Sequence, residues 1–219
     1  MVCAGSRRTH PFMFTERNYR MKKYLSFIVV AGLLVGSAEL ARAGNIVGTV
    51  KAHGARNSGD AVVFIEQIQG KTFPAPKEHA LMNQKGLRYH PHVLPILAGT
   101  TVDFLNDDDV LHNVFSPSEC ADKMNLGTWP KGQKRSFTFK NAGCRAVLLC
   151  NVHPEMEAFV VVLATPYYAV SAADGKYEIK DVPPGKYTLN IWHEKLKGKP
   201  MEIEVPAKGD VKADFDIHR

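Results

Sequence analysis

The chain has 219 residues, of which 45% are hydrophobic and 23% are charged, a composition that excludes wholesale disorder and allows one large domain or two small ones. Its net charge is +6, but residues 1–43 hold seven Lys or Arg against two Asp or Glu, which leaves 21 against 20 in the rest. That remainder is nearly neutral and has no concentrated basic stripe, so a nucleic-acid binder is excluded.

A targeting signal is predicted near the N-terminus. Residues 21–43 begin with Met-Lys-Lys, continue with an apolar run over 24–38 and end on Ala41-Arg42-Ala43. This order is typical of a secretory signal peptide, so we expect cleavage after Ala43 and export to the periplasm or another oxidising compartment. Residues 1–20 are interpreted as an upstream extension. The apolar run is short for a membrane span, and an uncleaved anchor is the alternative.

Short strands are predicted along the rest of the chain. Runs rich in β-branched and aromatic residues alternate with Gly, Pro, Asn and Asp turns, and no apolar period of 3.6 is sustained. Predicted strands include, in chain order, residues 46–50, 61–66, 100–105, 136–140, 146–150, 159–164, 176–179, 187–192 and 201–205. Their regular spacing is typical of β-sandwiches, so the predicted fold class is all-β.

One tight loop carries three side chains that bind metals. Cys150, His153 and Met156 occupy positions 1, 4 and 7 of this loop, and His112 lies upstream in a further predicted strand. Two His, one Cys and a weaker Met form the ligand set of a mononuclear blue-copper electron-transfer site. Zinc is less suited, because Met is a poor zinc ligand and structural zinc sites use Cys and His.

The sequence around these ligands resembles the cupredoxins, the blue-copper family that includes plastocyanin and amicyanin. The resemblance covers residues 78–164, and the loop spacing C-x-x-H-x-x-M is similar to that of amicyanin. The motifs that carry it are, in chain order, Val93-x-Pro95, Ala98-Gly99-Thr100-Thr101-Val102-x-Phe104-x-Asn106, His112-Asn113-Val114, Gly132-Gln133, Ser136-Phe137-Thr138-Phe139 and the Cys150 loop.

This resemblance implies a Greek-key sandwich with one copper ion held by His112, Cys150, His153 and, axially, Met156. It also implies that electrons leave at the edge of His153. Asn113 is similar to the family residue that ties the ligand strands together near the thiolate. The strand over 146–149 departs from the family, because it lacks the aromatic residues found there in many relatives.

Two further cysteines, Cys120 and Cys144, lie in the same region. In an exported protein such a pair is most simply a disulfide, and closing this loop of 24 residues would stabilise the fold by about 3 kcal/mol. Two reduced buried thiols are the alternative. Cys144 begins the strand that reaches Cys150, about 20 Å away at ~3.3 Å per residue, so it is not expected to be a ligand.

Other polar clusters have weaker interpretations. His79, His90 and His92 lie near the start of the copper-type domain and could form an auxiliary metal site, although surface or core histidines are the more ordinary interpretation. The run Asp107–Asp109 lacks the spacing of a calcium loop and is interpreted as a polar turn before His112.

The C-terminal part, residues 171–189, resembles the carboxypeptidase-regulatory-like family, whose members are small transthyretin-like β-sandwiches. Asp174-Gly175 and Pro184-Gly185 predict its turns. Residues 165–219 match only the second half of the family pattern, and residues 44–73 fit the first half. We therefore predict that 44–73 and 165–219 fold together around an inserted domain at 78–164. In the alternative, residues 44–73 pack onto the inserted domain.

The predicted function is that of an exported type 1 copper protein that carries single electrons between redox partners, such as a c-type cytochrome or a dehydrogenase. A non-redox copper-binding or delivery protein, and an interaction module with a vestigial copper site, are the alternatives. An enzyme is not expected, since four protein ligands leave no open position for a substrate.

Overall fold

The structure is a computed structural model that describes residues 43–219. The predicted extension and signal peptide, apart from Ala43, therefore lie outside the described residues. Among the residues described, no helix is long and apolar enough to cross a membrane.

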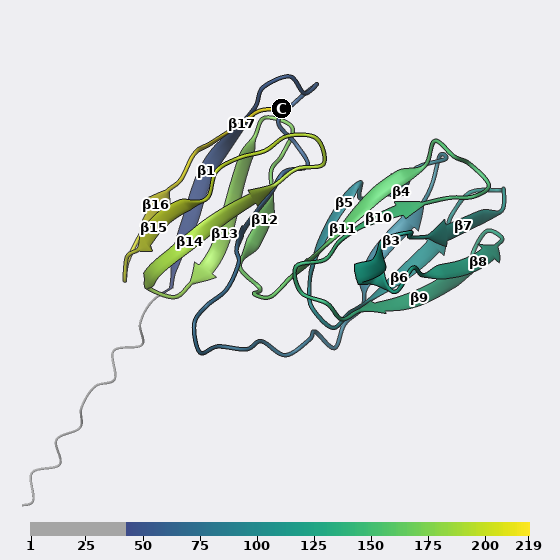
Figure 1. Ribbon diagram of the computed structural model, residues 1–219, viewed down its shortest axis with the longest axis horizontal. Coiled ribbons are helices and arrows are strands. Elements are labelled where there is room, and N and C mark those ends of the chain that lie inside the picture. Colours follow the sequence, from purple (N-terminus) through teal and green to yellow (C-terminus); the bar gives the residue numbers. More distant parts are fainter. Residues whose placement is uncertain (1–42) are drawn as a thin grey trace, which may run out of the picture. The chain divides into compact units, whose positions relative to one another are not determined.

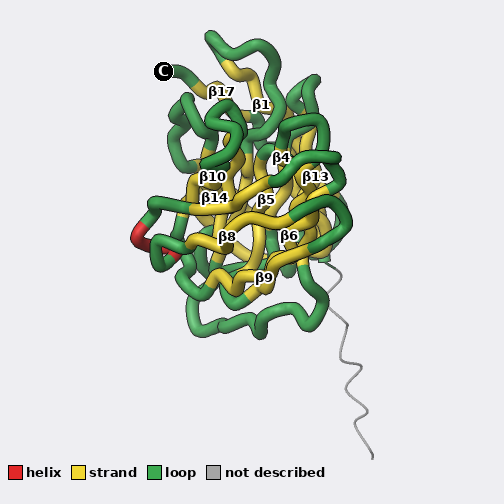
Figure 2. Tube along the Cα trace, turned by 90° about the vertical axis from the view of Figure 1, so that its right-hand side faces the viewer, coloured by secondary structure: helices red, strands yellow, loops and turns green. Residues whose placement is uncertain are grey.

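Nearly all the regular structure is β-strand (Figure 2), which confirms the predicted all-β class. The elements are β1 (Gly44–Ala52), β2 (Val62–Ile65), β3 (Ala80–Gln84), β4 (Tyr89–His90), β5 (Val93–Leu97), β6 (Thr100–Asn106), β7 (His112–Phe115), the 3-10 turn η1 (Glu119–Ala121), β8 (Asn125–Trp129), β9 (Lys134–Phe139), β10 (Arg145–Leu149), β11 (Glu157–Leu163), β12 (Tyr168–Val170), β13 (Lys176–Val182), β14 (Gly185–Trp192), β15 (Met201–Val205), β16 (Asp210–Lys212) and β17 (Phe215–Ile217).

Strands β3 to β11 form two sheets, which we call the central sandwich. One sheet has the order β4-β3-β6-β9 and the other the order β5-β11-β10-β7-β8. Strands distant in sequence are neighbours here, since β3 runs parallel to β6 and β5 runs parallel to β11. The chain therefore passes from one sheet to the other between such neighbouring strands. This connectivity is typical of Greek-key sandwiches.

The core of the central sandwich is apolar. Along its strands, residues that point into this core alternate with residues that are less buried. In β10, for example, Ala146 and Leu148 are fully buried between less buried neighbours, as the two-residue period of a strand requires. Bulky members of this core include Phe104, Trp129 and Phe139.

The remaining strands form a second pair of sheets, which we call the flanking sandwich. Strand β1 is hydrogen-bonded to β13, β16 and β17, and β2 to β12 and β14. Figure 1 shows the purple strand β1 among green and yellow strands from the far end of the chain. Residues before the central sandwich thus pair with residues after it. The discontinuous domain at 44–73 and 165–219, and its carboxypeptidase-regulatory-like assignment, stay predictions.

A smaller apolar cluster contains residues of both sandwiches. Val62 and Phe64 of β2 belong to it, as do Val93 of β5 and Val161 of β11. The Arg145 guanidinium lies 5.2 Å from the centre of the Phe64 ring, a cation–π contact.

The structure joins Cys120 and Cys144 in a disulfide. Cys120 lies in η1 and Cys144 directly precedes β10, whereas Cys150 directly follows β10 and is the free cysteine of the described residues. The bridge is therefore at the end of β10 opposite Cys150, and it does not compete for the Cys150 thiol.

Gly48 provides a test of the packing of β1 in the flanking sandwich. A Cβ on Gly48 would overlap the backbone oxygen of Ala213 and lie 2.9 Å from Cε1 of Tyr177. We expect Gly48→Ala to lower the free energy of unfolding by about 1–3 kcal/mol, as overpacking does. Urea unfolding followed by circular dichroism measures this loss.

Gly59→Ala is the matched control, because the nearest atom to its Cβ would be the movable Oδ1 of Asn57 at 3.1 Å. It should change the unfolding free energy by less than about 0.5 kcal/mol. Equal effects of the two substitutions would contradict the close approach of β1 to the segment around Ala213.

Candidate metal centre

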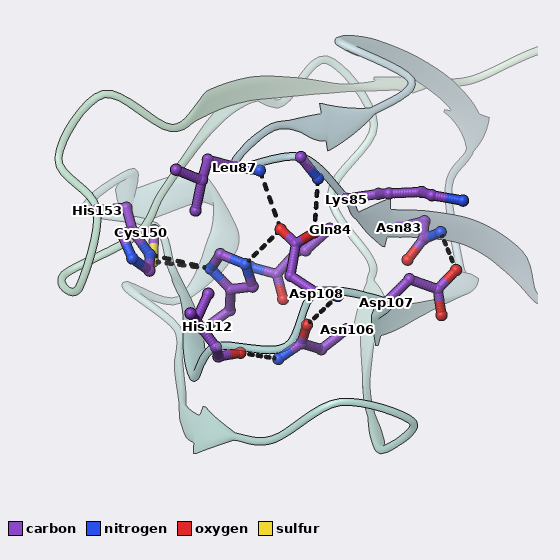
Figure 3. A network of polar contacts seen from close by, with 12 residues as sticks. Asn83, Gln84, Lys85, Leu87, Asn106, Asp107, Asp108, His112, Cys150 and His153 are labelled. Carbon is purple, nitrogen blue, oxygen red and sulfur yellow. Dashed lines mark hydrogen bonds and ion pairs between the residues drawn. The ribbon is translucent and has the colours of Figure 1, made fainter.

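Three of the predicted ligands converge in the structure. The ligand atoms of His112, Cys150 and His153 lie within 4.8 Å of one another, and in residues 43–219 no other group of three or more His, Cys, Asp or Glu does so. The Sγ of Cys150 is 3.9 Å from Nδ1 of His112, which is 3.1 Å from Nδ1 of His153 (Figure 3). Metal bonds of about 2.0 Å to nitrogen and 2.3 Å to sulfur place ligand atoms at roughly such separations.

The fold explains why these residues meet. His112 opens β7 and Cys150 directly follows β10, and these antiparallel strands are neighbours in one sheet. Leu149, the last residue of β10, pairs with Phe115, the last residue of β7, so the residues that follow β10 run alongside β7 toward His112. His153 follows in the loop from β10 to β11, where its carbonyl accepts a hydrogen bond of 3.0 Å from the Met156 N–H.

The candidate ligands differ in their burial. His112, Cys150 and Met156 are at most 2% exposed, while His153 is only half-buried. Met156 also belongs to the same apolar core cluster as Cys150. His153 is thus the candidate ligand that connects the cluster with the protein surface.

Asp108 orients the His112 ring. Its Oδ2 lies 2.9 Å from Nε2 of His112, and because a carboxylate accepts, the ring donates its proton there. Nδ1 of His112 is then unprotonated and directed toward Cys150 and His153, as Figure 3 shows. A carboxylate that fixes the tautomer in this way is common beside metal-binding histidines.

The Asp108 carboxylate is itself held by backbone donors. The N–H groups of Gly86 and Leu87 donate to it at 2.6 and 2.9 Å. Burial raises the pKa of Asp108, but the hydrogen bonds from Leu87, Gly86 and His112 outweigh burial and lower this pKa to about 2. Asp108 is therefore ionised at neutral pH and can keep the proton of His112 on Nε2.

Asn113 joins the two ligand-bearing strands to their surroundings. Its backbone N–H donates to Sγ of Cys150 at 3.5 Å, and its side-chain oxygen accepts from the Asn151 N–H at 3.3 Å. Its side-chain nitrogen donates to Asn125 and to the Gly127 carbonyl on β8. Asn113 therefore bonds both the segment that follows β10 and strand β8.

The remaining candidate residues have separate partners. His79 lies 2.9 Å from Asp103, His90 contacts the Lys85 carbonyl and His92 contacts the Glu157 carbonyl. The structure therefore does not assemble the auxiliary histidine site. The carboxylates of Asp107 and Asp109 bond Asn83 and Lys131 respectively.

Asp108 is the site residue that sequence reasoning missed. The sequence pattern predicts only a polar turn here, although Asp108 stands four residues before His112. Because the buried Asn106 side chain accepts from the Asp108 N–H and donates to the Val110 carbonyl, the turn curls back and brings Asp108 to the ring. The signal available in the sequence was a carboxylate four residues before a histidine, with a turn between them.

Four exposed apolar residues lie next to the two candidate histidines in sequence or contact the Asn106–Asp108 turn. Leu87, Val110, Leu111 and Val152 are 40 to 52% exposed, and they are four of the six exposed large hydrophobic residues in the described part of the chain. Val152 and Leu111 directly precede the two histidines, and Leu87 and Val110 contact the Asn106–Asp108 turn. We call these four residues the apolar rim.

Several solved structures resemble part of this chain. A reduced variant of amicyanin is 26% identical over 40% of this chain and 85% of its own, with a TM-score of 0.37. The Cu(I) form of another amicyanin variant is 24% identical over 45% of this chain and 98% of its own, also with a TM-score of 0.37. A copper-containing nitrite reductase from Thermus scotoductus SA-01 is 24% identical over 46% of this chain and 25% of its own, with a TM-score of 0.38.

No family model matches the chain, and no curated protein matches it. Any inference about a bound metal therefore depends on the ligand set itself.

The orienting role of Asp108 predicts the effect of its removal. Asp108→Ala should weaken copper binding by about 10–100-fold, the usual effect of losing a partner that orients a ligand. Competition with a chelator measures the affinity.

Asp109→Ala is the matched control, since the Asp109 side chain is 89% exposed and pairs with Lys131 on the surface. Such surface pairs contribute little, so copper affinity should stay unchanged. An Asp108→Ala protein with wild-type affinity would show that the carboxylate does not orient His112.

Proposed function

We propose that the protein binds one copper ion in a type 1 site formed by His112, Cys150, His153 and Met156, and that it carries single electrons between exported redox partners. The observation that carries this proposal is the convergence of one buried thiol and two imidazole nitrogens, one of which belongs to a half-buried ring.

The chemistry of the side chains favours copper. A thiolate and a thioether are soft ligands that suit Cu(I), and imidazole suits copper in either oxidation state. Copper in such a ligand set supplies one-electron exchange. A closed site with four protein ligands leaves no open position for a substrate, so we propose a carrier rather than an enzyme.

The protein contributes rigidity to this proposed function. His112 and Cys150 are buried, and Asp108 and Asn113 fix their positions through hydrogen bonds. Ligands that are held in place can accommodate both oxidation states with little rearrangement of the protein. The same burial argues against the alternative of a copper-delivery protein, because a donor of metal needs ligands that a recipient can reach.

The apolar rim suits brief contact with a redox partner. Exposed apolar side chains beside the two histidines would give a partner, such as a c-type cytochrome or a dehydrogenase, a contact surface that costs little to desolvate. The disulfide between Cys120 and Cys144 supports an oxidising, exported location, as the predicted signal peptide does.

Cys150 tests the type 1 site directly. Copper-loaded protein should show an intense visible thiolate-to-copper band and a narrow EPR hyperfine splitting, and Cys150→Ser should lose both. A double variant, Cys120→Ala with Cys144→Ala, controls for the loss of a cysteine elsewhere and should stay blue. A colourless wild-type protein, or one with an ordinary tetragonal Cu(II) spectrum, would overturn the proposal.

Val152 tests the route of electron exchange. Val152→Asp should slow electron self-exchange, measured by NMR line broadening, by at least tenfold. The reason is that burying a charge in an apolar contact costs more than the ~1.4 kcal/mol that corresponds to this factor.

Leu81→Asp introduces the same charge at a residue on β3 that is 54% exposed and outside the apolar rim. It should exchange electrons at nearly the wild-type rate. If the two variants slow the exchange equally, net charge is responsible and the apolar rim is not the contact surface.

A further inference from the structure

The two ligand-bearing strands are only loosely joined to each other by their own backbones. Strands β7 and β10 pair at a single position, Leu149 with Phe115. Two carbonyl groups near the metal centre, those of Asn113 on β7 and Leu149 on β10, accept hydrogen bonds from side chains.

Side chains from the opposite sheet supply these donors. The Tyr89 hydroxyl of β4 lies 3.0 Å from the Leu149 oxygen and 3.1 Å from the Asn113 oxygen, so its one proton is shared between the two strands. Gln84 of β3 adds a second donor, with its Nε2 3.2 Å from the Asn113 oxygen. Tyr89 is 3% exposed and Gln84 is fully buried, so water does not replace these bonds.

The two carbonyls are next to the ligands in sequence. Asn113 directly follows His112, and Leu149 directly precedes Cys150. From this placement, and resting on the proposed copper site, we infer that Tyr89 is a positioning residue whose hydroxyl sets the separation of the His112 and Cys150 backbones. Gln84 assists it on the His112 side.

Burial makes the Tyr89 hydroxyl a dependable donor. It raises the pKa of Tyr89 well above the usual range of a phenol, so the proton stays on the oxygen at neutral pH. The core packing of the ring restricts its movement, and the hydroxyl stays between the two strands. Tyr89 thereby links the sheet that carries the ligands to the sheet that does not.

The test compares two buried tyrosines that differ in position. Tyr177 is 6% exposed and its hydroxyl donates to the Ala213 carbonyl at 2.6 Å, in the flanking sandwich. Tyr89→Phe and Tyr177→Phe remove the same group and should lower the melting temperature similarly. Only Tyr89→Phe should weaken copper binding, by about tenfold, and alter the EPR hyperfine splitting and the thiolate-to-copper band.

Gln84→Met provides a second variant that keeps the Tyr89 hydroxyl. It should change the affinity in the same direction by a smaller factor, because the Asn113 carbonyl still accepts from Tyr89. Wild-type affinity and spectra in Tyr89→Phe, or equal copper effects in Tyr177→Phe, would overturn the inference. A wild-type protein that binds no copper would overturn the proposed function together with the inference. If the wild-type protein binds copper and Tyr89→Phe binds it equally well, only the inference fails.

Discussion

The antiparallel contact of β7 with β10 is the constraint on which the candidate metal centre depends. It brings the residues that directly follow β10 alongside β7, and so brings Cys150 close to His112. The remaining ligands need no further long-range contact, because His153 and Met156 follow Cys150 within one loop. A shift of this contact by one residue would move side chains to the opposite face of the sheet and separate the thiol from the imidazole.

Polar groups stabilise that contact inside an otherwise apolar sandwich. Unpaired polar groups in a core are costly, and here Asp108, Asn113 and Tyr89 form hydrogen bonds to buried groups around the candidate ligands. Each of them also links two segments that are distant in sequence. The hydrogen bonds that stabilise the core therefore also restrict the ligand geometry, which is why their removal should affect both stability and metal binding.

The flanking sandwich is built from segments that precede and follow the central sandwich in sequence. The chain leaves β2 at Ile65 and returns at Thr165, whose hydroxyl donates to the Ile65 carbonyl at 2.6 Å. The adjacent pair Phe64 and Tyr168 continues this contact into the sheet. Because the departing and returning segments are hydrogen-bonded to each other, the intervening residues can fold as a separate sandwich, in keeping with the tolerance of domains for insertions between neighbouring points.

Sequence alone determined the all-β class and the ligand loop, because strand alternation and the spacing of Cys150, His153 and Met156 are local patterns. It did not predict β3 or β8, whose Asn, Gln and Gly residues weaken the strand signal. The roles of Asp108, Gln84 and Tyr89 were decided only by the tertiary structure. Those side chains act across a turn or between sheets, and their partners are set by strand register and packing, which no local spacing encodes.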